Sequence, residues 1–128
     1  MILPAIASIL VVDDDRDLCD LLDALLTGEG YRVWCVYDGE VAWAAVQQEP
    51  PDLILSDIKM PKLDGVTLAV RLAETASGIP VILMSAGFDD WAGVASVFLR
   101  KPFEIDDLLA SVAVLITERK LGRATELR

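Results

Sequence analysis

Residues Ile9–Asp15 have the sequence ILVVDDD, an unbroken apolar run that ends in three aspartates. An apolar run without alternation is typical of a parallel β-strand that is covered on both faces. The next apolar residues, between 18 and 26, follow helical spacing, and glycines at 28 and 30 favour the end of a helix there. The stretch therefore predicts a buried strand that places acidic side chains at its carboxyl end and leads directly into a helix.

The rest of the chain repeats this alternation of strand and helix. Apolar or β-branched runs predict four further strands, at residues 32–37, 53–56, 81–84 and 97–99. Two helical patterns lie between these strands, one that Asp38 is placed to cap and one after Gly65. A last helical pattern follows the fifth strand, and its apolar face comprises Ile105, Leu108, Leu109, Val112 and Ile116. Five strands that alternate with helices predict an α/β domain, with a parallel sheet covered by helices on both faces.

The composition limits the classes of protein to which the chain can belong. Its 128 residues fit one domain, and the 54% of apolar residues argue against intrinsic disorder. The formal net charge of −10 disfavours direct binding to DNA or RNA, whose phosphates would repel it. The chain has no histidine, which excludes histidine-based acid–base chemistry and any role as a phosphohistidine donor.

The apolar N-terminus, residues 1–12, does not have the pattern of a targeting segment. It lacks a basic leading region and is too short to span a bilayer, so we expect a cytoplasmic protein without membrane contact. Cys19 and Cys35 do not have the spacing of metal ligands. We expect them to be small buried apolar side chains that form no disulfide bridge.

Polar residues follow four of the predicted strands at the point where each strand ends. Aspartates 13–15 come after the first strand, Asp57 after the third, Ser85 after the fourth and Lys101 after the fifth. Ligands of open α/β sheets bind at the carboxyl ends of the strands, so these side chains are expected to meet at one edge. Each residue alone has a simpler interpretation, Asp15 as a helix N-cap above all, and only the joint arrangement indicates a site.

The charges of this predicted site favour a bound cation. Asp13, Asp14 and Asp57 carry −3 and Lys101 carries +1, so the site sums to −3 + 1 = −2, which one Mg²⁺ would neutralise. Mg²⁺ prefers carboxylate and carbonyl oxygens and retains several waters. With metal and lysine to neutralise an incoming phosphoryl group, Asp57 could attack it directly, because a carboxylate is already ionised at neutral pH and needs no general base.

Four segments of the chain resemble the response-regulator receiver domains of two-component signalling. They are ILVVDDD at residues 9–15, DLILSDIKMPKLDG at 52–65, PVILMSA at 80–86 and LRKPF at 99–103, and together they extend over nearly the whole chain. The resemblance implies a single doubly wound five-stranded parallel sheet of strand order 2-1-3-4-5, with helices on both faces. We expect a receiver domain at residues 9–118, between an N-terminal tail at 1–8 and a C-terminal tail at 119–128.

The resemblance assigns the metal and phosphoryl chemistry to individual positions. Asp57 corresponds to the phosphoacceptor, Asp14 to a direct Mg²⁺ ligand, and Asp13 to a carboxylate that holds the metal through water. Lys59 would offer its backbone carbonyl to the metal. The phosphoryl group would come from a sensor histidine kinase or a phosphotransfer protein. Since the domain would catalyse only its own phosphorylation and slow dephosphorylation, we do not expect an enzyme in the usual sense.

A second group of residues corresponds to the phosphate-binding and switch positions of the family. Lys101 would bind the phosphoryl group, and its peptide bond to Pro102 would be cis. Ser85 would bond the phosphoryl group beside the amide of Ala86, and Phe98 would be the switch aromatic that fills the space vacated. The altered surface would be recognised by a downstream protein that the sequence does not identify.

The segment between Ser85 and Lys101 departs from the family pattern. It covers 101 − 85 = 16 positions, several fewer than the family usually has. We therefore expect the fourth helix to be shortened to a turn or two at residues 89–95, or missing, which puts the common dimer face of receivers in doubt. Phe88 and Trp91 could form a contact patch in its place, or cover the core where the helix is missing.

The side chain of Lys59 departs from the polar or acidic residues that are frequent at this position. A charged lysine cannot accept a proton from the water that attacks the phosphoryl group, so we expect a long-lived aspartyl phosphate. Two other functions remain open: a Mg²⁺-dependent phosphatase or phosphotransferase, and a binding module that acts without phosphorylation. The enzyme is disfavoured by Lys59 and by the lack of room for a cap domain, and the binding module by the complete set of site residues.

Overall fold

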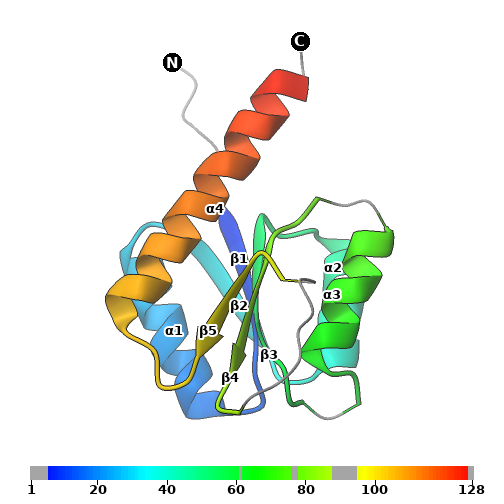
Figure 1. Ribbon diagram of the computed structural model, residues 1–128, viewed down its shortest axis with the longest axis vertical. Helices are drawn as coiled ribbons and strands as arrows, with labels where there is room; N and C mark the ends of the chain where they lie inside the picture. Colours follow the sequence, from blue (N-terminus) through cyan, green and yellow to red (C-terminus); the bar gives the residue numbers. More distant parts are fainter. Residues whose placement is uncertain (1–5, 61, 76–77, 88–94, 127–128) are drawn as a thin grey trace.

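The computed structural model describes residues 6–60, 62–75, 78–87 and 95–126, and it confirms the predicted α/β fold. Five parallel strands form one sheet in the order β2-β1-β3-β4-β5, with helices on both faces (Figure 1). The elements in chain order are β1 (Ser8–Val12), α1 (Arg16–Gly28), β2 (Arg32–Val36), α2 (Gly39–Gln48), β3 (Leu53–Asp57), α3 (Gly65–Glu74), β4 (Val81–Ser85), β5 (Val97–Arg100) and α4 (Ile105–Glu126).

The three central strands are the most apolar parts of the chain, which explains their place in the sheet. Every residue of β1, β3 and β4 is buried. In the register of the sheet, Asp57 lies beside Met84, and Ser85 lies beside Arg100. The strands thus end at nearly the same level, and the residues that follow them share one edge of the sheet.

Alternate residues of a central strand face the two helical layers. In β1, Ile9 and Val11 pack in the core beneath α1 and α4, whereas Leu10 and Val12 pack in the core beneath α2 and α3 (Figure 1). Because both faces of the strand are buried, its sequence is a continuous apolar run and not an alternation of apolar and polar residues.

Aspartate side chains cap the first three helices at their N-termini. Each accepts a hydrogen bond from the backbone amide three residues further on: Asp15 at 3.2 Å, Asp38 at 2.8 Å and Asp64 at 2.7 Å. A cap of this kind typically contributes about 1 kcal/mol. The caps predicted at Asp15 and Asp38 are confirmed, and all three fix a helix start close to the edge where the polar residues gather.

Helix α4 continues to Glu126 and so includes most of residues 119–128, which the sequence predicts to be a C-terminal tail. Leu108, Val112 and Ile116 are buried as predicted. Beyond them, Arg119 ties the helix to the segments that lead into β4 and β3. Its Nη1 donates to the Gly78 carbonyl at 2.7 Å, and its Nε lies 3.7 Å from an Asp52 carboxylate oxygen. Within the described ranges, none of the helices is both long enough and apolar enough to cross a membrane.

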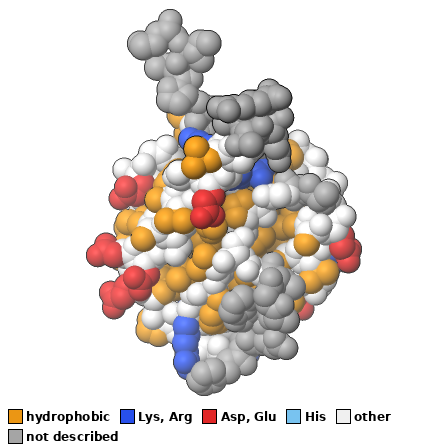
Figure 2. Space-filling model, turned by 45° about the horizontal axis from the view of Figure 1, so that its top comes forward, with side chains coloured by type: hydrophobic (Ala, Val, Ile, Leu, Met, Phe, Trp, Pro, Cys, Tyr) orange, Lys and Arg blue, Asp and Glu red, His pale blue; other side chains and the backbone are white. Residues whose placement is uncertain are grey.

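A cavity of about 710 Å³ opens between the second half of α3 and the middle of α4, at the start of β4. Ala69, Leu72, Val81 and Leu115 contribute apolar side chains to its lining. Figure 2, in which the top of the Figure 1 view comes forward, shows apolar side chains across much of this face and several acidic side chains along its left margin. The cavity lies at the opposite end of β4 from Ser85, so it is separate from the edge where the acidic residues gather.

The connection from β4 to β5 is described only at its ends. Residues 88–94 lie outside the described residues, and with them Phe88, Trp91 and nearly all of the short helix expected at residues 89–95. At the start of β5, the Ser96 amide donates to the Val81 carbonyl at 2.8 Å. In the parts of this connection that the structure describes, the chain passes from β4 to β5 without a helix.

Candidate functional site

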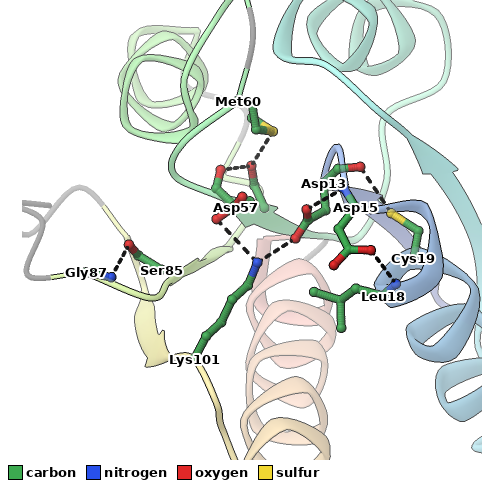
Figure 3. A network of polar contacts seen from close by, with 10 residues as sticks. Asp13, Asp15, Leu18, Cys19, Asp57, Met60, Ser85, Gly87 and Lys101 are labelled. Carbon is green, nitrogen blue, oxygen red and sulfur yellow. Dashed lines mark hydrogen bonds and ion pairs between the residues drawn. The ribbon is translucent and has the colours of Figure 1, made fainter.

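The carboxyl ends of β1, β3, β4 and β5 meet at one edge of the sheet, as the predicted topology requires (Figure 3). Asp13 follows β1, Asp57 is the last residue of β3, Ser85 is the last residue of β4, and Lys101 follows β5. The side chains of Asp13, Asp57 and Lys101 point toward one another, whereas the Ser85 hydroxyl points toward Gly87 (Figure 3). The fold thus brings residues from distant parts of the sequence into one cluster.

Asp13 is wholly buried, which is rare for a carboxylate. One of its oxygens accepts the Asp15 amide at 2.9 Å, and the other lies 2.9 Å from the Lys101 Nζ. Its backbone is held as well, because its amide donates to the Val36 carbonyl at 3.2 Å and its carbonyl accepts the Cys19 thiol at 3.3 Å. These contacts fix the position of the Asp13 carboxylate before any ligand binds.

Lys101 bridges the carboxylates of Asp13 and Asp57. Its Nζ lies 2.9 Å from Asp13 Oδ2 and 3.5 Å from Asp57 Oδ1. Burial alone would lower the pKa of Lys101, but the hydrogen bond and charge of Asp13, together with the charge of Asp57, outweigh it and raise the pKa. The ammonium therefore stays charged at neutral pH. The peptide bond between Lys101 and Pro102 is cis, as predicted.

Asp57 is nearly buried, with 9% of its surface exposed. Burial raises the pKa of Asp57, and the negative charge of Asp13 raises it further. Lys101, through its charge and a hydrogen bond, and the Ile58 amide both lower the pKa of Asp57. They do not cancel the rise. The cluster thus holds more negative charge than Lys101 compensates, and a further cation would relieve this excess.

A model of the response regulator receiver domain matches residues 9–113 of the chain. The chain belongs to this family. It is a receiver domain of two-component response regulators, as its sequence motifs predicted.

Curated relatives of this receiver domain are themselves regulators. The transcriptional regulatory protein DltR of Streptococcus agalactiae is 32% identical over 126 residues, which cover 94% of this chain and 56% of the relative. The response regulator GtcR of Aneurinibacillus migulanus is 38% identical over 125 residues, which cover 93% of this chain and 49% of the relative. The receiver domain thus spans about half the length of the curated relatives that it matches.

Solved structures show the same fold. The crystal structure of NtrX from Brucella abortus superimposes with a TM-score of 0.84 at 31% identity, over 97% of this chain and 30% of that chain. A response regulator receiver domain protein from Clostridium thermocellum superimposes with a TM-score of 0.83 at 27% identity, over 91% of this chain and 98% of that chain. The second match has almost the same extent as this receiver domain, so the two correspond along nearly their whole length.

The three acidic residues predicted as metal ligands come together in the receiver domain. Asp13, Asp14 and Asp57 each offer one carboxylate oxygen, and these oxygens lie within 4.8 Å of one another. Asp14 is exposed beside the two more buried members, so the cluster opens to solvent. The oxygen ligands, their spacing and the uncompensated charge at Asp57 all fit a hard divalent cation such as Mg²⁺.

The structure also describes the other residues that were predicted for the site of the receiver domain. Ser85 Oγ accepts the Gly87 amide at 3.1 Å, and Ala86 is exposed directly after it. Lys59 is exposed on the loop that follows Asp57. Phe98 is half-buried on β5, beside Leu83 in the register, and packs with the core beneath α2 and α3.

Both cysteines of the receiver domain are free thiols, as predicted. Cys19 is buried, but Cys35 is only partly buried, because β2 is an edge strand of the sheet. The Cys35 thiol donates to the Cys19 carbonyl at 3.6 Å. Burial, followed by the neighbouring Cys35 and Asp13, raises the pKa of Cys19 to about 12, so this thiol is not a nucleophile at neutral pH.

Two close backbone contacts near Asp57 have no direct signal in the sequence. A Cβ at Gly65 would lie 2.3 Å from the Asp57 carbonyl oxygen, and a Cβ at Gly39 would lie 1.9 Å from the Leu63 carbonyl oxygen. A glycine one position after a helix-capping aspartate occurs at both places. That pattern alone does not reveal which backbone lies against the glycine, because the contact is made in the folded chain.

Proposed function

We propose that Asp57 accepts a phosphoryl group from a phosphohistidine of a sensor histidine kinase or a phosphotransfer protein, with Mg²⁺ bound by the acidic cluster. The observation that carries this proposal is the position of Lys101, 2.9 Å from Asp13 and 3.5 Å from Asp57. A fixed ammonium beside a nearly buried carboxylate provides a place for a phosphoryl dianion next to a nucleophile.

The transfer forms one bond and breaks one. A carboxylate oxygen of Asp57 attacks the phosphorus, and the P–N bond to the donor imidazole breaks as the new O–P bond forms. The donor imidazole carries a proton on its other ring nitrogen, keeps the electron pair of the broken bond, and so leaves as neutral histidine. No base on the receiver domain is required, since the attacking carboxylate is deprotonated at neutral pH.

Bound Mg²⁺ would neutralise charge on the phosphoryl oxygens. Its protein ligands would be carboxylate oxygens of Asp14 and Asp57 and the backbone carbonyl of Lys59, with Asp13 holding it through water. Lys101 neutralises the remaining charge. Its ammonium has three N–H donors, which is enough to keep Asp13 and Asp57 and to contact a phosphoryl oxygen as well.

The phosphoryl group would then change a surface of the domain. The Ser85 hydroxyl accepts a hydrogen bond of 3.1 Å from the Gly87 amide. It would give up this bond and donate to a phosphoryl oxygen beside the Ala86 amide. Phe98, half-buried on the neighbouring strand, would fill the space vacated. The resulting surface is recognised by a downstream protein.

We place this reaction in the cytoplasm, where ATP for a histidine kinase is present. The domain catalyses only its own phosphorylation and slow dephosphorylation, so it is not an enzyme that turns over an external substrate. With a net charge of −10, it does not bind nucleic acid directly. A relative, the regulator RpaA of Synechocystis, is named as DNA-binding, but this chain matches only about half of that protein.

The proposal is tested by incubation with Mg²⁺ and acetyl phosphate, followed by intact-mass measurement. The expected result is one added phosphoryl group per chain that is absent in Asp57→Asn and absent when EDTA removes the metal. No adduct with any phosphodonor or metal would favour a binding module that acts without phosphorylation. Continuous hydrolysis of phosphate esters would instead favour a phosphatase.

A further inference from the structure

Gly39, the first residue of α2, lies against the loop that connects β3 to α3. It is buried, and a Cβ added there would lie 1.9 Å from the backbone oxygen of Leu63 and 2.6 Å from the Leu63 Cβ. Real Cβ atoms essentially never approach other heavy atoms within 3.0 Å, and the first of these neighbours is backbone. Only glycine therefore allows α2 to begin in this position, in direct contact with the loop.

The same loop is held next to Asp57 at both of its ends. Where it leaves β3, the Ile58 amide donates to the Met84 carbonyl at 2.9 Å. Where it enters α3, the Gly65 amide donates to the Ile58 carbonyl at 2.8 Å, and Gly65 lies against the Asp57 carbonyl. The loop thus begins and ends beside the residue proposed as phosphoacceptor, and α2 contacts the loop between these ends.

Lys62, in the same loop, has a backbone conformation that its surroundings must maintain. Its φ of 70° lies in the left-handed region, which costs a residue other than glycine about 1–2 kcal/mol. The Lys62 Nζ lies 4.0 Å from an oxygen of Asp38, the aspartate that also caps α2. Two consecutive residues at the start of α2, Asp38 and Gly39, therefore contact the loop.

We propose that Asp38 and Gly39 are positioning residues for the metal site. They hold the β3–α3 loop in the place where the backbone carbonyl of Lys59 reaches a Mg²⁺ bound by the acidic cluster. This inference rests on the proposed function, since the role of Lys59 is part of that proposal. The start of α2 contributes no metal ligand, but it would still strengthen Mg²⁺ binding by holding the loop in place.

The size of the contact explains why the metal site should be sensitive to it. Moving the Leu63 oxygen from 1.9 Å to 3.0 Å from a new Cβ requires a backbone shift of about 1 Å in the loop or in α2. Mg²⁺ demands near-ideal octahedral geometry with ligand distances of about 2.0–2.1 Å. A Lys59 carbonyl that moves with the loop by about 0.5 Å can no longer meet these ligand distances.

The test compares Gly39→Ala with Gly28→Ala by calorimetric titration with Mg²⁺ alone. Gly28 is the matched control, because it also lies in a helix and a Cβ there has no heavy atom within 4 Å. We expect Gly39→Ala to weaken Mg²⁺ binding at least about tenfold, as is typical for residues that orient metal ligands, and Gly28→Ala to leave it unchanged. With acetyl phosphate, Gly39→Ala should need more Mg²⁺ for half-maximal phosphorylation, yet approach the wild-type rate at saturation.

A second pair of variants tests the inference even if Gly39→Ala does not fold. Asp38→Asn keeps a capping oxygen but removes the charge opposite Lys62, whereas Glu40→Gln removes an exposed charge from the same helix turn. We expect Asp38→Asn to weaken Mg²⁺ binding about two- to threefold more than Glu40→Gln does. Equal Mg²⁺ affinities within each pair would overturn the inference, whereas a wild-type chain that does not bind Mg²⁺ would overturn the proposed function itself.

Discussion

Lys101 donates a hydrogen bond of 2.9 Å to Asp13, a carboxylate with no exposed surface. Removal of one partner of a fully buried ion pair costs about 3–5 kcal/mol, because the remaining charge is left without compensation. The Lys101 side chain keeps 22% of its surface exposed, so the cost here should be smaller. Loss of Lys101 alone should therefore destabilise the fold, and the pair holds an ammonium in the candidate site.

The first prediction concerns Lys101→Met, which keeps the length of the side chain and removes its charge. In EDTA, we expect the free energy of unfolding to fall by about 2–3 kcal/mol, because three carboxylates then share one site without a cation. Added Mg²⁺ should restore most of this loss. Urea unfolding with and without Mg²⁺ measures both effects. Lys120→Met, at an exposed lysine of α4, is the control, and a loss for Lys101→Met that Mg²⁺ does not reduce would contradict the prediction.

The second prediction concerns the pH dependence of stability at Asp57. Burial and the charge of Asp13 raise the pKa of Asp57 above its ordinary value of 3.8 in the folded state. The folded chain therefore binds this proton more readily than the unfolded chain, and stability falls as the pH rises through the interval above 3.8. Asp57→Asn removes this effect.

In the absence of metal, Asp57→Asn should be more stable than the wild type at pH 7, and the difference should shrink as the pH falls toward 3.8. Urea unfolding in EDTA over a series of pH values measures this trend. Asp20→Asn, at an exposed aspartate of α1, serves as the control. An advantage of Asp57→Asn that stays constant with pH would show that the ionisation of Asp57 is not its cause.

The third prediction concerns Arg119, which joins the second half of α4 to the segments that lead into β3 and β4. Its side chain is 10% exposed, and it donates to the Gly78 carbonyl at 2.7 Å and pairs with Asp52 at 3.7 Å. Since hydrogen bonds to charged groups contribute about 1.5–3 kcal/mol, Arg119→Ala should destabilise the domain by about that amount. Amide hydrogens of α4 after residue 118 should also exchange faster. Lys120→Ala, at the exposed neighbour, should change neither quantity, and equal effects of the two variants would exclude this role of Arg119.

Arg119 also shows which parts of the structure cannot be predicted from the sequence. The five strands and the residues at their ends are predictable because an apolar run and the polar residue that ends it are neighbours in the chain. The continuation of α4 is different. Arg119 stands in a charged segment that resembles an exposed tail, and its partner Gly78 is 41 residues away. The same holds for Gly39, whose contact with Leu63 exists only in the folded chain.

The last prediction concerns the lifetime of the phosphoryl group. Lys59 is exposed two positions after Asp57, and its ammonium group has only N–H donors, so it cannot accept a proton from an attacking water. Asparagine can accept a hydrogen bond from that water and orient it. Lys59→Asn should therefore shorten the half-life of the phosphorylated domain, by about tenfold if orientation of the water is limiting.

The half-life is measured as the loss of the adduct mass after removal of acetyl phosphate. Lys120→Asn is the control, because it removes the same charge from an exposed position on α4, outside this loop. If both variants shortened the half-life equally, the cause would be the net charge of the domain and not the side chain beside the phosphoryl group. An unchanged half-life in Lys59→Asn would mean that residue 59 does not control the attack of water, and that the lifetime is set by how far the carboxylate cluster and Lys101 shield the phosphorus from solvent.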